Sequence, residues 1–220
     1  MTPEIREIAV FTTLAALAAT VLMLVPGIAV AWLLARRSFP GKAVVETLVS
    51  LPLVVPPVAT GLLLLWLLGR RGPLGSALEG AGIDVVFTPV AVVIAMAVMG
   101  LPLLVRTARA GFEQVTRRYE QVAETLGAGP WRVFASITVP LASRHILAGA
   151  LIAFSRCLGE FGATIVVAGS IPGRTRTLAS GIYTFTETGA DRQAAMLVAI
   201  SLTIAFASVL ASNRLARAID

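Results

Sequence analysis

Four long stretches of the chain contain no Asp, Glu, Lys or Arg, and they constrain the fold more than any other feature. They run over 8–35, 47–69, 85–105 and 193–213 and are 28, 23, 21 and 21 residues long. A helix of 21 residues is about 31 Å long at about 1.5 Å per residue, enough to cross the hydrocarbon core of a bilayer. Only 14% of the 220 residues are charged, against about a quarter in a soluble domain. The sequence therefore predicts a multi-span membrane protein.

A fifth apolar stretch, 146–168, carries two charges, Arg156 and Glu160. We therefore predict an all-α integral membrane protein with a single transmembrane domain, residues 1–220. Its five transmembrane helices are expected at about 10–35, 47–69, 87–107, 146–168 and 193–213. The polar segment at about 113–140 then forms a loop between the third and fourth spans.

The net charge of +6 is distributed unevenly over the predicted loops. If the amino terminus is outside, eleven Lys or Arg residues fall on inside segments and six on outside segments. The positive-inside rule favours this orientation, with the carboxyl terminus and the 113–140 loop in the cytoplasm. The eleven are Arg36, Arg37, Lys42, Arg106, Arg109, Arg117, Arg118, Arg132, Arg144, Arg214 and Arg217. The basic charge is thus explained by membrane topology, and we expect no nucleic-acid partner.

The 113–140 loop reads as two short amphipathic helices separated by a break. An apolar stripe at helical spacing is formed by Val115, Tyr119, Val122 and Leu126. Gly127, Gly129 and Pro130 are expected to end this helix, with Pro130 in the first turn of the next one. The second helix has an apolar face of Val133, Phe134 and Ile137, and Pro140 is expected to close it. Such a loop is shaped to enter a groove on another protein.

The spacing within this loop resembles the cytoplasmic loop of permease subunits of type I ATP-binding-cassette importers. That signature reads E-A-A, three residues, G, nine residues and I-x-L-P. Here Gln121-Val122-Ala123 is followed by Gly127 and then by 137–140, which reads ITVP. Gln121 replaces Glu, Val122 replaces Ala and Val139 replaces Leu, while Glu120 stands one residue early. An amphipathic helix lying on the bilayer surface is the alternative interpretation.

The resemblance implies that this loop couples the permease to a cytoplasmic ATPase. The residues expected to form the coupling surface are Tyr119, Glu120, Gln121, Val122, Ala123, Leu126, Gly127 and Trp131. No glycine-rich phosphate loop ending in Lys and Ser or Thr occurs in the chain, so a partner subunit would hydrolyse the ATP. We expect a transport subunit without enzymatic activity of its own.

The second predicted span contains three prolines within six residues, Pro52, Pro56 and Pro57. Broken helices survive in a membrane only against other helices or along a cavity. The candidates for the transport pathway in this span are Ser50, Pro56, Pro57 and Thr60. A plain proline kink without a pathway role is the alternative.

The fourth predicted span holds Arg156 and Glu160 four residues apart, so the two side chains share a helix face and can pair. Charges inside a span are costly and face the bundle interior or water. Arg156, Glu160 and Thr164 are therefore candidates for the pathway or its gate. A structural pair that fixes helix packing is the alternative, and we favour it slightly because a bare carboxylate would repel an anion.

The run SRCLGEFGATIVVAGSIPGRTRTL at 155–178, followed by GIYT at 181–184, resembles the molybdate permease subunits among oxyanion permeases. The resemblance extends from about residue 38 to the end of the chain. It implies a homodimer in the bacterial or archaeal cytoplasmic membrane, in contact with lipid. It also implies two cytoplasmic ATP-binding subunits and an extracytoplasmic oxyanion-binding protein. Tungstate, sulfate and thiosulfate remain alternative substrates.

An intramembrane enzyme is the alternative of another class, with Glu160, His145 or Cys157 as its reactive group. His145 and Glu160 are 15 residues apart in the sequence, or about 22 Å along one helix. Cys157 and His145 are the only cysteine and the only histidine, so no cluster of metal ligands is built from them. We therefore expect no catalytic residue, metal or cofactor.

Overall fold

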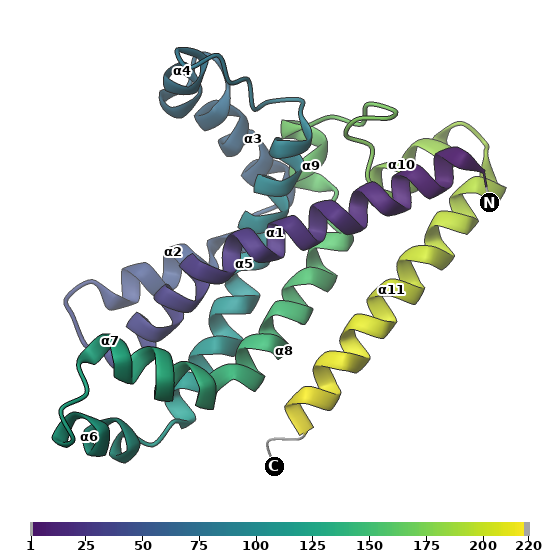
Figure 1. Ribbon diagram of the computed structural model, residues 1–220. Helices are drawn as coiled ribbons and strands as arrows, with labels where there is room; N and C mark the ends of the chain where they lie inside the picture. Colours follow the sequence, from purple (N-terminus) through teal and green to yellow (C-terminus); the bar gives the residue numbers. More distant parts are fainter. Residues whose placement is uncertain (1, 218–220) are drawn as a thin grey trace.

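The computed structural model of the protein describes residues 2–217, and in this range every regular element is helical (Figure 1). The long helices are α1 (Pro3–Arg36), α5 (Pro89–Gln114), α8 (Val139–Leu158) and α11 (Asp191–Arg217). The shorter elements are α2 (Lys42–Val54), α3 (Pro57–Leu68), α4 (Pro73–Glu79), α6 (Arg117–Thr125), α7 (Pro130–Val133), a π-helical turn η1 (Phe134–Thr138), α9 (Gly162–Val167) and α10 (Leu178–Glu187). The predicted all-α fold is confirmed. Met1, 218–220 and the side chains of Ala216 and Arg217 belong to the predicted domain 1–220 but lie outside the described part of the chain.

The centre of the bundle is formed by α1, α5 and α8; α1 crosses α5 and α8, which run side by side in Figure 1. Small buried residues line these contacts: Ala15, Ala16, Ala19, Ala91, Ala95 and Ala153. Gly100 on α5 belongs to the same pattern, because a Cβ atom there would lie 3.0 Å from the Cys157 sulfur on α8. Membrane helices associate through such small residues, since apolar burial gives little advantage among lipid tails.

Four helices among the described residues have the length and hydropathy needed to cross a membrane. They cover Pro3–Arg36, Pro89–Gln114, Pro130–Leu158 and Asp191–Leu215. A fifth crossing is possible only if α2 and α3 act together, and these two helices meet at an angle of 114°. The chain therefore has four candidate spans, or five if the bent pair is counted as one.

The bend between α2 and α3 falls within the predicted span 47–69 and has a chemical cause. Pro56 and Pro57 have no backbone N–H, so the helical hydrogen bonds of α2 cannot continue through them. The last bond runs from the Val55 N–H to the Leu51 carbonyl at 2.9 Å, and the next helix begins with the Ala59 N–H donating to the Pro56 carbonyl at 2.9 Å. The prolines thus divide this segment into two helices.

A second break falls within the predicted span 146–168. α8 ends at Leu158 and α9 begins at Gly162, so 159–161 interrupts the helix. The Glu160 carboxylate accepts a hydrogen bond from the Ala163 N–H at 2.7 Å and so replaces a helical bond lost at the start of α9. The predicted span 146–168 is therefore interrupted at 159–161, where the Glu160 carboxylate bonds to the start of α9.

The end of the molecule that carries α4 lies away from the end that carries α6 and α7 (Figure 1). Near α4, Arg70 makes a two-pronged contact with Asp84, with N–O distances of 3.2 and 2.9 Å. The Arg70 guanidinium holds the pKa of the Asp84 carboxyl below its usual value, first through this hydrogen bond and then through its charge. This ion pair joins the two ends of the loop between α3 and α5.

Candidate functional site

The helical loop 115–138 joins α5 to α8 and contains both short amphipathic helices. α6 is followed by Gly127, whose φ of +87° is a left-handed conformation that suits glycine. The Gly127 N–H donates to the Glu124 carbonyl at 2.9 Å and the Ala128 N–H to the Ala123 carbonyl at 3.0 Å, which is a Schellman ending. α7 then begins with Pro130 in its first turn. The predicted helix, break and second helix are confirmed.

Two details of the predicted loop are wrong. Val115 is not part of the exposed stripe, because it caps the C-terminal end of α5 and is buried. Pro140 does not close the second helix, because one continuous helix runs over Pro130–Leu158. The π turn just before Pro140 provides the explanation: the Val139 N–H bonds to the Phe134 carbonyl, and the wider turn leaves room for the proline ring.

The outer face of α6 is apolar and exposed. Tyr119, Val122 and Leu126 are 58%, 51% and 83% exposed, and Trp131 at the start of α7 is 77% exposed. Of the other predicted coupling residues, Gln121 is exposed and Ala123 is half-buried. α6 contains no buried residue. An amphipathic helix that turns its apolar side outward, away from the protein, offers a docking surface.

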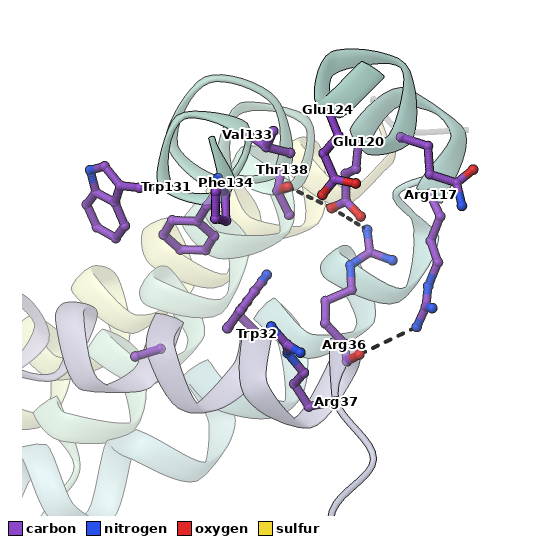
Figure 2. Close-up of a pocket in the computed structure, with 13 residues that line it drawn as sticks. Trp32, Arg36, Arg37, Arg117, Glu120, Glu124, Trp131, Val133, Phe134 and Thr138 are labelled. Atoms are coloured by element: carbon purple, nitrogen blue, oxygen red, sulfur yellow. Dashed lines mark hydrogen bonds and ion pairs between the residues drawn. The ribbon is translucent and has the colours of Figure 1, made fainter. Parts of the chain in front are cut away.

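The inner face of α6 is held by a carboxylate (Figure 2). Glu120 Oε1 lies 3.0 Å from Arg36 Nη2 at the end of α1, and the Thr138 hydroxyl donates to the same oxygen at 2.7 Å. The Glu120 side chain is only 17% exposed. The carboxylate of this predicted coupling residue therefore points toward α1 and η1, opposite to the apolar face.

Arg36, the cationic partner in this arrangement, is largely enclosed, with 9% of its side chain exposed. Its Nη2 also donates to the Val115 carbonyl at 2.9 Å, so one guanidinium joins the ends of α1 and α5 to α6. Its Nε has no hydrogen-bond partner among the described residues. A cation at the C-terminal end of α1 is also favourably placed in the dipole of that helix.

A cavity of about 560 Å³ lies between the end of α1 and the helical loop, and Figure 2 shows its lining. Trp32 and Phe134 meet edge to face across it, with ring centroids 5.4 Å apart, and Trp131 lies 5.5 Å from Phe134. Arg37 lies over the Trp32 ring at 5.8 Å. These aromatic contacts fix α7 and η1 on α1.

The pathway candidates of the fourth predicted span come together at the break between α8 and α9. Arg156 Nη1 lies 2.8 Å from Glu160 Oε2, and 1% of the Glu160 side chain is exposed, against 28% for Arg156. The Thr164 hydroxyl donates to the Phe161 carbonyl at 3.0 Å and to the Glu160 carbonyl at 3.3 Å. Glu160 is thus fully committed to Arg156 and to the start of α9.

The pathway candidates of the bent pair lie beside this break. Pro56 is exposed, Pro57 is half-buried and Thr60 is buried. A Cβ atom added to Gly162 would lie 2.7 Å from the Pro57 Cβ. One added to Gly61 would lie 2.8 Å from the Ala163 Cα, so the two interrupted segments pack with their backbones in close approach.

Ser50, the remaining candidate, lies in the second half of α2, before the bend. Its hydroxyl accepts a hydrogen bond from Arg106 Nη2 at 3.3 Å. Arg106 is exposed, whereas Arg109, on the next turn of α5, forms ion pairs with both Glu46 and Glu113. Ser50 is therefore joined to α5 and not to the α8–α9 break.

Several residues of the site escaped prediction. No role in the site was predicted for Arg36, Thr138, Gly61 or Gly162. The signals available in the sequence were weak: an arginine at a helix end, a glycine four residues after Pro57 and a glycine two residues after Glu160. Within residues 2–217, no group of three or more His, Cys, Asp or Glu residues could hold a metal ion.

Comparison with known proteins identifies the family to which the chain is similar. The family model described as "Binding-protein-dependent transport system inner membrane component" matches residues 27–220. The chain is 48% identical over 193 residues to the molybdenum transport system permease protein ModB of Escherichia coli K12, covering 87% of this chain and 84% of that protein. It is 33% identical over 219 residues to the sulfate transport system permease protein CysT of the same strain, covering 98% and 79%.

Two solved structures share the fold. A bacterial ABC transporter involved in the import of the acidic polysaccharide alginate matches with a TM-score of 0.70 at 18% identity, over 100% of this chain and 81% of that one. An inward-facing form of the MetNI methionine ABC transporter matches with a TM-score of 0.67 at 13% identity, over 100% of both chains. At these identities the likeness concerns the fold alone.

Proposed function

The chain belongs to the family of inner-membrane components of binding-protein-dependent transport systems, and we propose that it is the permease subunit of an ATP-driven importer for molybdate. In this role it forms the membrane path and alternates between outward-open and inward-open states. ATP hydrolysis belongs to a partner, because the sequence has no phosphate-binding loop of its own.

One observation carries this proposal: α6 exposes its apolar face and turns its carboxylate inward. Tyr119, Val122 and Leu126 form an apolar surface on a helix with no buried residue of its own. In isolation such a surface is unfavourable in water, and a groove on a second protein would cover it. The occupant that fits is an ATP-binding subunit, which must transmit force to the membrane helices.

The other partners follow from the same family. We propose a homodimer, two cytoplasmic ATP-binding subunits and an extracytoplasmic oxyanion-binding protein. The exposed apolar side chains on one face of α1, namely Val10, Leu14, Leu17, Val21 and Val25, suit lipid. Those on α2 and α3, including Val44, Leu48, Val54, Val58 and Leu63, are available to a second copy.

The amino terminus is proposed to lie outside and the carboxyl terminus inside. Arg36 contacts Glu120 on the inner face of α6, and Arg117 donates from α6 to the Arg36 carbonyl; both belong to the larger basic group of the sequence. The α4 end carries fewer basic residues, and Asp84 neutralises one of them. The positive-inside rule then puts α6 in the cytoplasm, where an ATPase is found.

The pathway is proposed to run beside the junction of the two broken segments. Gly61 and Gly162 bring this junction together, and prolines without N–H donors leave backbone carbonyls free there. The Arg156–Glu160 pair lies at the same junction, and we assign it a structural role because the carboxylate is buried and doubly bonded.

Transport into proteoliposomes tests the substrate. The permease is reconstituted with its ATP-binding subunit and supplied with the oxyanion-binding protein loaded with labelled molybdate. We expect uptake that needs ATP and that unlabelled molybdate or tungstate suppresses more than sulfate does. Preferential suppression by sulfate would refute molybdate as the substrate, and uptake without the ATP-binding subunit would refute the importer mechanism.

A further inference from the structure

Two parts of the helical loop are attached to the membrane helices in different ways. α7 and η1 are fixed by aromatic packing, since Phe134 contacts Trp32 at 5.4 Å and Phe112 at 6.5 Å between ring centroids. α6 has no buried residue, so apolar burial contributes little to its position. Polar bonds must therefore set where α6 lies relative to the bundle.

The carboxylate of Glu120 supplies those bonds on the inner face of α6. Its Oε1 accepts from Arg36 Nη2 at 3.0 Å and from the Thr138 hydroxyl at 2.7 Å. Arg36 belongs to the last turn of α1 and Thr138 to the π turn that leads into α8. One oxygen atom of α6 is thus shared by the two helices that cross in the centre of the bundle (Figure 2).

Burial makes this contact strong and directional. The Arg36 side chain is 9% exposed and the Glu120 side chain 17%. Hydrogen bonds between charged groups are stronger than neutral ones, and water screens them little at this depth. Arg36 also donates to the Val115 carbonyl at the end of α5, at 2.9 Å. This bond ties its guanidinium to α5, so Arg36 resists a movement of Glu120 away from α5.

Glu124, the neighbouring acidic residue of α6, does not link α6 to α1 or to η1. Glu124 lies one turn further along the same face of α6 and lines the same cavity, but it is exposed, and its carboxylate forms no hydrogen bond or ion pair with the residues that the structure describes. The two glutamates have the same charge and differ in their partners. Glu124 is therefore a matched control for Glu120.

We propose that Glu120 is a positioning residue that passes movement of α6 to α1 and α8 through Arg36 and Thr138, in place of a direct contact with the ATPase. This inference rests on the proposed function of α6 as the docking helix. When the ATP-binding subunit displaces α6, the shared oxygen pulls on the end of α1 and on the π turn before α8. The apolar face binds the partner, and the carboxylate on the opposite face transmits the displacement.

The test uses the full transporter with three variants and one control. Glu120→Gln, Arg36→Gln and Thr138→Val are each co-expressed with the ATP-binding subunit, and Glu124→Gln is treated alike. Three quantities are measured: copurification of the ATPase, basal ATP hydrolysis, and the stimulation of hydrolysis by the loaded binding protein. Only the last should change if the bonds transmit movement and do not merely fold the loop.

We expect copurification and basal hydrolysis to stay within about twofold of wild type in all four variants. Stimulation should fall by about tenfold or more in Glu120→Gln and Arg36→Gln, and by about threefold in Thr138→Val, because the Arg36–Glu120 bond joins two charged groups and the Thr138–Glu120 bond involves only one. The double variant Arg36→Gln/Glu120→Gln should lose less than the product of the two single losses. Glu124→Gln should behave as wild type.

Three results would overturn the proposal. Loss of copurification in Glu120→Gln but not in Arg36→Gln would make Glu120 an ATPase contact. Loss of copurification in all three variants would mean that the bonds only fold the loop, and full stimulation in all three would mean that they transmit nothing. Failure of the docking role is distinguishable, since Leu126→Asp would then keep both copurification and stimulation.

Discussion

Removing Arg156 tests the charged pair at the break between α8 and α9. In Arg156→Ala the Glu160 carboxylate, 1% exposed, would keep only its bond to the Ala163 N–H. Loss of one partner from a buried ion pair costs about 3–5 kcal/mol. Because the Arg156 side chain is 28% exposed and its charge is partly solvated, we expect the lower end, about 3 kcal/mol or roughly a hundredfold in the folding equilibrium.

The reverse change is expected to cost less. Glu160→Gln keeps an oxygen that can accept from the Ala163 N–H, and the Arg156 it leaves behind is within reach of water. We expect a loss of about 1.5–2 kcal/mol, in the lower part of the range for a hydrogen bond to a charged group. The double variant leaves no buried charge, so it should lose less than the sum of the single losses by at least about 1 kcal/mol.

The free energy of unfolding is measured for the four proteins in mild detergent, by titration with a denaturing detergent and loss of helical circular dichroism. Ser155→Ala is the control, because the Ser155 hydroxyl donates only to the Leu151 carbonyl of its own helix. Its effect should stay within about 0.5 kcal/mol. Additive losses in the cycle would refute the pairing. A stable double variant that does not transport would refute the structural role and would show that the pair acts in the transport pathway.

Three further predictions concern the helical loop and the topology. Leu126→Asp should put an unpaired charge into the docked interface, so copurification of the ATPase should fall by about a hundredfold. The control Leu126→Met should keep normal copurification. Equal copurification of the two variants would refute the docking surface. Gly127→Leu should destabilise the helical loop by about 1–2 kcal/mol, because a leucine is strained at the φ of +87° found there. The variant should reach normal abundance in the membrane but show lower stimulated ATP hydrolysis. Unchanged stimulation would show that coupling does not need the Schellman ending. In a Cys157→Ser background, Ala77→Cys should react with an impermeant thiol reagent from outside and Arg118→Cys only from inside; the reverse pattern would refute the proposed orientation.

The membrane character of the protein could be predicted from the sequence because it depends on local composition. Charge-free runs such as 85–105 and 193–213 leave a helix no other environment than lipid or other helices. The end of α6 and the start of α7 could also be predicted, since Gly127 and Pro130 act through their own backbone geometry. Features that depend on a few neighbouring residues were therefore visible in the sequence.

The coupling surface could be predicted only in part. Tyr119, Val122 and Leu126 follow from helical periodicity, which groups them on one side of α6. Periodicity does not say which side of a helix faces the bundle. In a soluble protein the apolar side would face inward. Here the polar side of α6 faces the bundle, because the buried guanidinium of Arg36 pairs with Glu120 there.

Tertiary structure alone decided the contacts between distant segments. Glu120 lies 84 residues from Arg36, and no local pattern in the chain relates the two. The close approach of Gly61 to Ala163 likewise depends on where two separate helices are interrupted. Pro140 continues a helix because a π turn precedes it, although a proline in that position ordinarily marks a boundary. Local chemistry fixes each helix and its ends, whereas the partner of a buried charge or a small residue is chosen by the packing of the whole bundle.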